Sequence, residues 1–332
     1  MSRITILGAG AWGTALAISL ARRGGHQITL WSHSPKVAEQ LTETNENLLY
    51  LPGFTIPFDV NVTADLPASI FEANIILCVT PSQHLRGVLS DVAPLLTRNQ
   101  VLLSASKGLE EGSHLRMSQV IASITDCRVA VLSGPTFAQE VAAGSPSAIV
   151  AASTDDKLAQ IIQREFSSPS LRVYTNHDVI GVELGGALKN VIALASGVVT
   201  GLNLGHNSAA ALITRGIAEI TRLSVACGGR RQTLAGLAGL GDLVLTATGA
   251  LSRNRTVGIE LGKGRRLADI LAGMGGKVAE GVLSTGSALG LAARYTLEMP
   301  IIEQVDAILH KNKKPADAMR DLMSRPGRDE QY

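Results

Sequence analysis

The chain has 332 residues, of which 45% are hydrophobic, and its formal net charge is +2 at pH 7. This length suits two domains with at least one large core, and the hydrophobic fraction excludes a disordered chain. The nearly balanced charge predicts no bulk attraction to nucleic acid or to anionic membranes, so any basic residues that serve function must act locally.

The cysteines and the first residues of the sequence indicate a reducing compartment. Cys78, Cys127 and Cys227 lie far apart and form no C-x-x-C pair, as expected for free thiols. The histidines show no metal-binding spacing, so the sequence predicts no metal site. The sequence opens on a strand pattern rather than on the apolar run of a signal peptide, and we therefore expect a cytoplasmic protein.

Short apolar runs alternate with helix-length segments up to about residue 177. The expected strands are, in chain order, "RITILG", "QITLWS", "NIILCV", "QVLLSAS", "RVAVLS", "SAIVAA" and "LRVYT". Helices are expected between most of them, including Ala11–Arg23, Pro35–Thr44 and Ser82–Leu96. The strands are continuously apolar, which is typical of a parallel sheet with helices on both faces. Residues 1–177 are therefore predicted to form a Rossmann-type, doubly wound α/β domain with a mostly parallel sheet.

The second part of the chain shows a different pattern. From residue 178 onward the sequence is rich in Ala, Leu and Gly with a helical period, and no strand pattern remains. The expected helices are Val179–Thr200, Asn207–Cys227, Arg265–Ala272 and Thr285–Tyr295. We predict an all-α C-terminal domain over residues 178–332, with a polar and frayed tail.

The first expected strand leads into a glycine motif, Gly8-x-Gly10-x-x-Gly13, which opens the first helix. This strand–turn–helix context is the one that dinucleotide binding requires. Gly8 permits the tight turn, Gly10 lets the backbone approach a pyrophosphate, and Gly13 allows close packing of the helix on the strand. The helix N-terminus then faces the phosphates, so the motif predicts NAD or NADP as cofactor.

The end of the second expected strand bears on the choice between NAD and NADP. A site selective for NAD carries Asp or Glu here to bind the ribose hydroxyls. This chain has Ser32, His33 and Ser34 instead, with Lys36 just beyond. A 2′-phosphate would meet no repulsion there, so we expect NADP to be accepted and preferred. The alternative is a solvated loop with no ligand.

An apolar stretch, Gly181–Val199, contains Glu183 and Lys189. Three interpretations of the lysine are open. A lone lysine usually lays its stem on the apolar surface and keeps its charge in water. In a dry site, its pKa would instead fall toward a value useful for proton transfer. The stretch is also long enough to span a membrane, although its charged residues and its glycines argue against a span.

Polar residues elsewhere suggest a second ligand. Lys107 follows an expected strand, at the sheet edge where ligands of doubly wound sheets bind, and Gly134–Thr136 does the same. The helical part contributes Asp242 and the donor cluster Ser252–Arg255. Arginine holds phosphate with two parallel hydrogen bonds, so a small phosphate ester in a cleft between the two parts is expected. A solvated basic tetrapeptide is the alternative.

Taken together and in order, these blocks resemble the bacterial-type NAD(P)-dependent glycerol-3-phosphate dehydrogenases. The matching blocks are "GAGAWGTA", "YLPG", "SASKGLE", "SGPTFAQEV", "GVELGGALKNVIALASG", "AALITRGIAEI", "GLAGLGDLVLT", "SRNRTVG" and "VAEGVLST". The resemblance runs through essentially the whole chain. It implies reversible NAD(P)H-dependent reduction of dihydroxyacetone phosphate to sn-glycerol 3-phosphate, which supplies the backbone of phospholipids, and it allows a homodimer.

The resemblance also implies roles for individual residues. Lys189 would be the general acid/base beside the reacting carbon, with Lys107 and Asp242 in the same catalytic pocket. The implied substrate contacts are Lys107, Gly134, Thr136, Lys189, Asn190, Asp242, Ser252, Arg253 and Asn254. The implied cofactor contacts are Gly8, Gly10, Ala11, Trp12, Gly13, Ser32, His33, Tyr50, Lys107, Ala138, Arg253, Val278 and Glu280.

Some positions depart from the family pattern. Thr136 replaces the usual serine and keeps its hydroxyl. Ser32 stands where the family often has arginine, which weakens the case for a 2′-phosphate. His206 stands where the family usually has aspartate, and we have no physical account of that change.

Three other functions stay open on sequence alone. A related β-hydroxyacid dehydrogenase would share the two-domain plan and the helix lysine but act on a carboxylate. A Schiff-base lyase could be built on Lys189, although it has no need of a dinucleotide turn. A dinucleotide-binding sensor would need no chemistry, and the coexistence of Lys107, Lys189 and Asp242 argues against it. The "SRNR" and "SGPT" blocks favour the phosphate ester.

Overall fold

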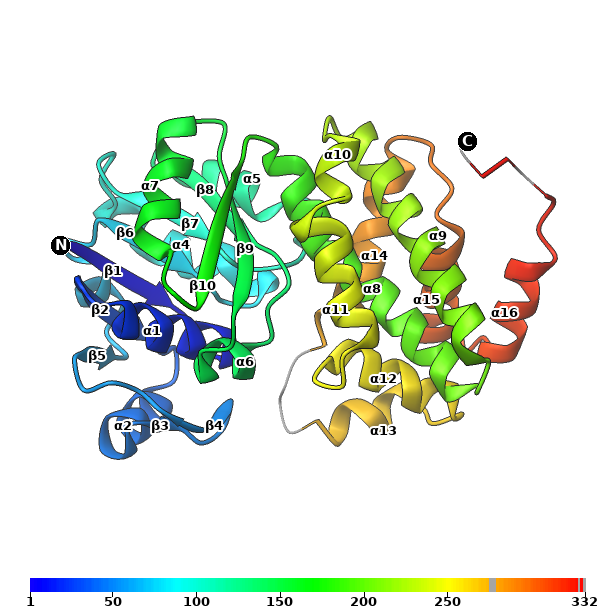
Figure 1. Cartoon of the computed structure of the whole chain (residues 1–332), viewed down its shortest axis with the longest axis horizontal. Helices are drawn as coiled ribbons and strands as arrows, with labels where there is room; N and C mark the ends of the chain where they lie inside the picture. The colour runs from blue at the N-terminus through cyan, green and yellow to red at the C-terminus, as the bar shows by residue number, and fades with distance from the viewer. Residues whose placement is uncertain (275–278, 328, 331–332) are drawn as a thin grey trace.

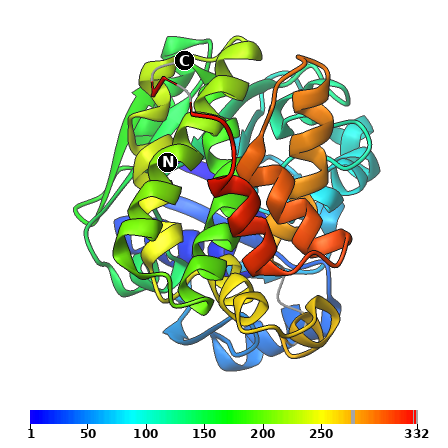
Figure 2. The same cartoon turned by 90° about the vertical axis from the view of Figure 1, so that its right-hand side faces the viewer.

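The computed structural model describes residues 1–274, 279–327 and 329–330. A sheet covered by helices forms one side of the molecule, and a group of helices forms the other (Figure 1). Seen from the helical side, the helices stand in front of the sheet (Figure 2).

The first part is built on an eight-stranded sheet in the order β10-β9-β8-β7-β6-β1-β2-β5. Its strands are β1 (Ser2–Leu7), β2 (His26–Trp31), β5 (Val60–Thr63), β6 (Ile75–Cys78), β7 (Val101–Ser104), β8 (Arg128–Ser133), β9 (Ser147–Ala152) and β10 (Leu171–Asn176). All neighbours are parallel except the antiparallel pair β8 and β9. The predicted mostly parallel, doubly wound sheet is confirmed. All seven expected strands form, and β5 is an edge strand that the sequence analysis missed.

Apolar side chains project from both faces of the sheet into two separate cores. Ile4 and Ile6 of β1 pack with Leu16 of the first helix in one core, whereas Leu7 and Ile76 belong to a second core on the other face. The covering segments are α1 (Ala11–Arg23), α2 (Pro35–Thr44), α3 (Leu66–Ile70), α4 (Leu85–Val92), α5 (Met117–Ala122), α6 (Ala138–Ala143) and α7 (Asp156–Phe166), with a hairpin of β3 (Glu46–Asn47) and β4 (Leu51–Thr55).

The prediction of one continuous helix over Ser82–Leu96 is wrong. The segment Ser82–Leu96 is divided into a 3₁₀ turn at Ser82–His84, the helix α4, and a second 3₁₀ turn at Ala93–Leu95. Pro94 has no N–H to continue the α-helical hydrogen-bond ladder, which accounts for the break at the far end.

The second part is entirely helical within the described residues. It contains α8 (Val179–Gly201), α9 (Gly205–Ala226), α10 (Arg231–Leu234), the π-helical turn η3 (Leu237–Gly241), α11 (Asp242–Thr248), α12 (Arg253–Gly262), α13 (Leu267–Ala272), α14 (Glu280–Ala293), α15 (Pro300–His310) and α16 (Pro315–Met323). The helix expected at Thr285–Tyr295 begins earlier, at Glu280, and ends at Ala293.

Helix α8 forms the centre of this helical part. It has the length and the mean hydropathy, 1.4, of a membrane span, but 89% of its apolar window is buried inside the protein. Glycines on both helices allow α12 to lie very close to α8: a Cβ on Gly197 of α8 would lie 2.1 Å from the carbonyl oxygen of Arg255, and one on Gly258 of α12 would lie 2.0 Å from that of Leu194. Burial in a protein core therefore accounts for the apolar composition of α8.

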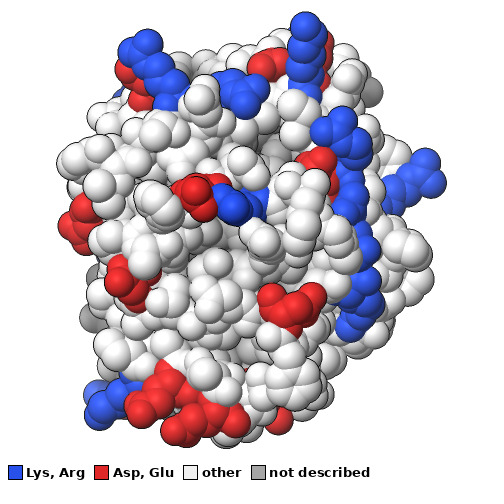
Figure 3. Space-filling model, turned by 90° about the vertical axis from the view of Figure 1, so that its left-hand side faces the viewer, with Lys and Arg blue, Asp and Glu red and all other residues white. Residues whose placement is uncertain are grey.

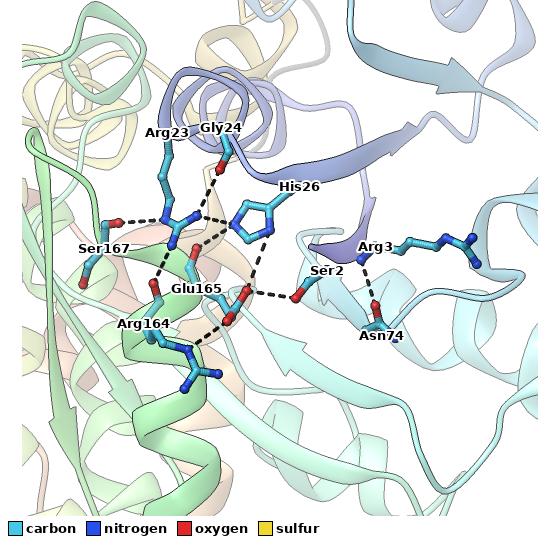
Figure 4. Close-up of polar contacts among 9 residues, drawn as sticks. All are labelled: Ser2, Arg3, Arg23, Gly24, His26, Asn74, Arg164, Glu165 and Ser167. Atoms are coloured by element: carbon cyan, nitrogen blue, oxygen red, sulfur yellow. Dashed lines mark hydrogen bonds and ion pairs between the residues drawn. The ribbon is translucent and has the colours of Figure 1, made fainter.

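A network of polar contacts joins the amino-terminal edge of the sheet to the ends of α1 and α7 (Figure 4). Arg23 at the end of α1 contacts His26 Nε2 at 2.8 Å and donates to the carbonyl oxygen of Ser167 at 2.9 Å. The Ser2 hydroxyl donates to Glu165 on α7 at 2.9 Å. Burial lowers the pKa of His26. The outer face of the sheet-bearing part shows acidic and basic side chains interspersed (Figure 3), in keeping with the small net charge.

Candidate active site

The structure places two lysines on opposite oxygens of one carboxylate, that of Asp242. Asp242 is completely buried and begins α11, directly after η3. Lys107, which follows β7, donates to Asp242 Oδ2 at 2.7 Å and to the carbonyl oxygen of Gly134 at 2.9 Å. Lys189 on α8 donates to Asp242 Oδ1. The three residues predicted to be catalytic are therefore in direct contact, although they come from separate parts of the sequence.

Lys189 lies in a dry site. Its side chain is only 7% exposed, so the interpretation in which it keeps its charge in water is wrong. Burial lowers the pKa of Lys189 to about 7; Asp242 opposes this change and the charge of Lys107 adds to it. Near neutral pH this group can thus exist as an ammonium or as an amine.

Two glycines on α8 allow the helix to bring Lys189 to the sheet. A Cβ on Gly185 would lie 2.4 Å from the carbonyl oxygen of Ala238, in the π-helical turn. One on Gly186 would lie 2.5 Å from the hydroxyl of Ser133, at the end of β8. A larger residue at Gly185 would push α8, and with it the lysine, away from the backbone of the π-helical turn, and one at Gly186 would displace the Ser133 hydroxyl.

The predicted phosphate cluster lies at the start of α12. Ser252 is buried and its hydroxyl caps the helix by accepting from the N–H of Arg255 at 3.2 Å. The Asn254 amide donates to Asn190 Oδ1 at 3.0 Å and accepts from the N–H of Gly281 at 2.9 Å. Asn190, next to Lys189, is therefore joined to the cluster through Asn254.

The two arginines of the cluster differ. Arg253 is exposed, and its charge lies close enough to Glu280 to influence it electrostatically. Arg255 is half-buried, with Nη2 3.5 Å from the hydroxyl of Thr200 and an Nε atom that has no hydrogen-bond partner among the described residues. Arg255 packs on α8 and does not behave as a solvated neighbour.

The loop after β8 supports Lys107. Gly134 has φ +140°, a conformation that favours glycine, and its carbonyl oxygen accepts from Lys107. The Thr136 hydroxyl also donates to that carbonyl oxygen, at 3.2 Å. Ala138 begins α6 and packs against the core.

The glycine turn fits a dinucleotide. Gly8 has φ +125°, and a Cβ on Gly13 would lie 1.9 Å from the carbonyl oxygen of Gly8. A Cβ on Gly10 would meet nothing within 4 Å, so there is open space in front of the N-terminus of α1. Nearby, Trp12 Nε1 and Thr80 Oγ1 are buried without a partner among the described residues, and a bound ligand could supply one.

The remaining predicted cofactor contacts differ from one another in burial and in hydrogen bonding. The Ser32 hydroxyl is buried and donates to the carbonyl oxygen of Ser34 at 3.1 Å, so it already has a partner, whereas His33 is exposed. Tyr50 is half-buried in the hairpin. Val278 lies outside the described residues.

The sequence analysis missed Ser82, which contacts Glu280. Ser82, just after β6, donates to Glu280 Oε2 at 3.1 Å, and burial raises the pKa of Glu280. The signal for Ser82 was its position, since it follows a strand at the edge that carries Lys107.

Family models match both parts of the chain. The N-terminal model of NAD-dependent glycerol-3-phosphate dehydrogenase matches residues 3–159, and the C-terminal model matches residues 178–320. The chain belongs to this family. It is 61% identical to a glycerol-3-phosphate dehydrogenase (NAD(P)+) of Acidobacterium capsulatum, over 99% of this chain and 100% of the relative. It is 50% identical to one from Geobacter sulfurreducens, over 99% of each.

Solved structures agree with this membership. Glycerol-3-phosphate dehydrogenase of Coxiella burnetii superposes with a TM-score of 0.94 at 40% identity, over 98% of this chain and 99% of that one. A ketopantoate reductase from Ralstonia eutropha has a TM-score of 0.62 at 16% identity, covers 96% of this chain and 99% of its own, and shares the fold alone. The predicted resemblance is confirmed: the protein is an NAD(P)-dependent oxidoreductase of the glycerol-3-phosphate dehydrogenase family.

Proposed function

We propose that the protein catalyses the reversible NAD(P)H-dependent reduction of dihydroxyacetone phosphate to sn-glycerol 3-phosphate, with Lys189 as general acid/base. Family membership supports the reaction. The residue roles are carried by one observation, the buried contact of Lys189 and Lys107 with the single carboxylate of Asp242. The product would feed the synthesis of phospholipids.

Proton transfer follows from the state of Lys189. During reduction, the ammonium of Lys189 donates a proton to the carbonyl oxygen of the substrate, and during oxidation the neutral amine takes it back. A pKa of about 7 lets one residue serve both directions. Asp242 holds the ammonium in position, while the nearby charge of Lys107 favours its deprotonation and stabilises negative charge developing on the substrate oxygen.

Recognition of the phosphate group is assigned to the start of α12. Ser252, Arg253 and Asn254 supply a hydroxyl, a guanidinium and an amide from one helical turn, and Asn190 joins this turn to Lys189. Gly134 and Thr136 would complete the substrate pocket from the sheet side. We assign the sheet-bearing domain to residues 1–177 and the helical domain to residues 178–332, with the substrate between them.

The cofactor would lie along the glycine turn and the N-terminus of α1. When bound, the nicotinamide supplies the hydride for reduction or accepts it in the reverse direction. Gly8, Gly10 and Gly13 shape the turn, and Arg253 and Glu280 would approach the cofactor from the helical domain. The cytoplasm is the proposed compartment, since Cys78, Cys127 and Cys227 are all free.

The test is oxidation of NADPH and of NADH by the purified protein with dihydroxyacetone phosphate. Turnover should give sn-glycerol 3-phosphate, and unphosphorylated dihydroxyacetone should be a poor substrate. The matched alternative substrate is a 2-oxo acid such as ketopantoate. Faster turnover of the oxo acid than of the phosphate ester would contradict the proposal and favour the carboxylate-specific alternative.

A further inference from the structure

A buried amide connects the β3–β4 hairpin with the glycine turn. Asn47 is 0% exposed. Its Nδ2 donates to the carbonyl oxygen of Ala9 at 2.9 Å and to the hydroxyl of Thr14 at 2.8 Å. Its Oδ1 accepts from the backbone N–H of Tyr50 at 3.1 Å. Both donor hydrogens of this side chain are thus engaged in or beside the glycine turn, and its acceptor oxygen is engaged within the hairpin.

The contact with Ala9 fixes the orientation of a functional peptide group. In a trans peptide, the carbonyl oxygen of Ala9 and the N–H of Gly10 point in opposite directions. Because Asn47 holds the Ala9 oxygen on the protein side, the Gly10 N–H must point away from Asn47. A Cβ on Gly10 would meet nothing within 4 Å, so a ligand has room to approach this peptide, and within the described residues the Gly10 N–H has no protein acceptor.

We propose that Asn47 is a positioning residue for dinucleotide binding: it locks the Ala9–Gly10 peptide so that the Gly10 N–H faces the pyrophosphate. The inference rests on the proposed function, because it assumes that a dinucleotide occupies the turn. Glycine residues make this turn intrinsically free to rotate, so an external lock removes conformational freedom that binding would otherwise have to remove. The backbone N–H of Tyr50, in the hairpin, completes the set of bonds that orient the Asn47 amide.

The experiment measures the Kd of NADPH directly, from its fluorescence on binding, without substrate turnover. Asn47→Leu has a similar volume and removes all three bonds. It should raise the Kd about tenfold, the size expected for a buried hydrogen-bond set that orients one binding group. At saturating NADPH, the KM for dihydroxyacetone phosphate should stay near the wild-type value. Thr14→Val removes a single acceptor and should give a smaller increase, and Thr14→Ser should restore the wild-type Kd.

A matched control separates positioning from general stability. Gln100 is also a buried amide; it donates to the carbonyl oxygen of Ile70 at 3.1 Å and accepts from the N–H of Thr97 at 2.9 Å, at the amino-terminal edge of the sheet. Gln100→Leu should lower the unfolding midpoint but leave the NADPH Kd unchanged. Equal Kd values for wild type and Asn47→Leu, or an equal rise in Gln100→Leu, would overturn the inference.

Thr14→Val keeps the inference testable if Asn47→Leu does not fold: an unchanged Kd in Thr14→Val would then count against it. Failure of the wild type to bind either NADPH or NADH would contradict the proposed function itself.

Discussion

Lys189 on α8 and Asp242 on α11 form an ion pair inside the protein. Neither residue would be stable there alone, because an unpaired buried charge is costly. The charges around this pair do not cancel, because Lys107 contacts the same carboxylate and brings a second positive charge. The arrangement therefore favours loss of a proton from Lys189 and arrival of a negatively charged substrate.

Removing the Lys189 amine should abolish proton transfer while leaving the cofactor site intact. Lys189→Met should reduce kcat by at least about a hundredfold, the low end of general acid–base contributions. The Kd for NADPH should remain unchanged, because Lys189 does not belong to the glycine turn. Steady-state kinetics and direct binding check both parts, and near-normal turnover in a folded variant would exclude the catalytic role.

The pH dependence should have opposite signs in the two directions. Reduction needs the ammonium, so its kcat/KM should be highest below about pH 7 and fall above it, where Lys189 loses its proton. Oxidation needs the neutral amine and should rise with pH through the same region. Lys107→Met removes a charge that lowers the pKa of Lys189, so the fall in reduction should move to higher pH.

The control for that shift is Lys157→Met. Lys157 is exposed on α7, away from the ion pair, and its loss should leave the profile unchanged. A profile that is the same in wild type and Lys107→Met would contradict the coupling between the two lysines.

Arg253 should matter for the phosphate group and not for the carbonyl. Losing a hydrogen bond to a charged group costs roughly 1.5–3 kcal/mol, so Arg253→Ala should lower kcat/KM for dihydroxyacetone phosphate by roughly tenfold to a hundred-and-fiftyfold. Arg253→Lys should recover only part of the loss, because an ammonium lacks the planar fork. The low activity on unphosphorylated dihydroxyacetone should fall much less, because only the proposed cofactor contact of Arg253 affects that substrate. An equal loss with both substrates would assign Arg253 to the cofactor alone.

Arg255 cannot serve as the silent control, since it packs on α8 beside Thr200. Its alanine variant should lower the unfolding midpoint. Arg266, whose side chain is 82% exposed, is a better match, and Arg266→Ala should leave both kinetics and stability near wild type.

NADPH should be used at least as well as NADH, because no carboxylate stands at the end of β2. His33 is exposed there, so His33→Asp adds a negative charge without disturbing the core. Repulsion of the 2′-phosphate should shift the NADPH-to-NADH ratio of kcat/KM toward NADH by about tenfold, equal to ~1.4 kcal/mol. His33→Asn is the uncharged comparison, and a similar shift in that variant would rule out repulsion as the cause.

Glu219 should make stability depend on pH. It is buried on α9 and accepts the N–H groups of Ile301 and Ile302 at the start of α15. Burial raises its pKa from 4.5 to about 7. Between these two pH values the folded state keeps the proton on Glu219, whereas the unfolded state has lost it. The unfolding free energy should therefore fall as pH rises from 4.5 to 7, by up to ~3 kcal/mol.

Glu219→Gln removes this titration. Relative to wild type at the same pH, the variant should gain stability between pH 5 and pH 8 in urea unfolding. Comparing the two proteins at each pH cancels the opposite contribution of His26, whose lowered pKa makes folding less favourable in acid. A constant difference between the two proteins over this range would contradict the assignment.

Much of the fold could be predicted from sequence because it is local. Continuous apolar runs identified the buried parallel strands, and the strand–glycine–helix pattern identified the turn at Gly8 without any tertiary information. The break in the helix at Pro94 and the short strand β5 were missed, because both depend on a few residues with weak local signals.

The site was less accessible, because its contacts join distant segments. Lys107 and Asp242 are 135 residues apart, and only resemblance placed them in one pocket. Nothing near Asn47 in the sequence indicates that its amide reaches back to Ala9. Likewise, hydropathy could not distinguish α8 from a membrane span or Arg255 from a solvated residue, because burial is decided by the neighbours that pack against each segment.

The position of α8 also affects what happens when the protein is heated. The folded chain hides a nearly uncharged segment of 23 residues among other helices, and unfolding would expose all of it at once. In water without denaturant, such segments associate with one another faster than a large chain refolds. Loss of this enzyme on heating should therefore be irreversible, and its useful lifetime will be set by how often the helices around α8 separate rather than by an equilibrium between folded and unfolded chains.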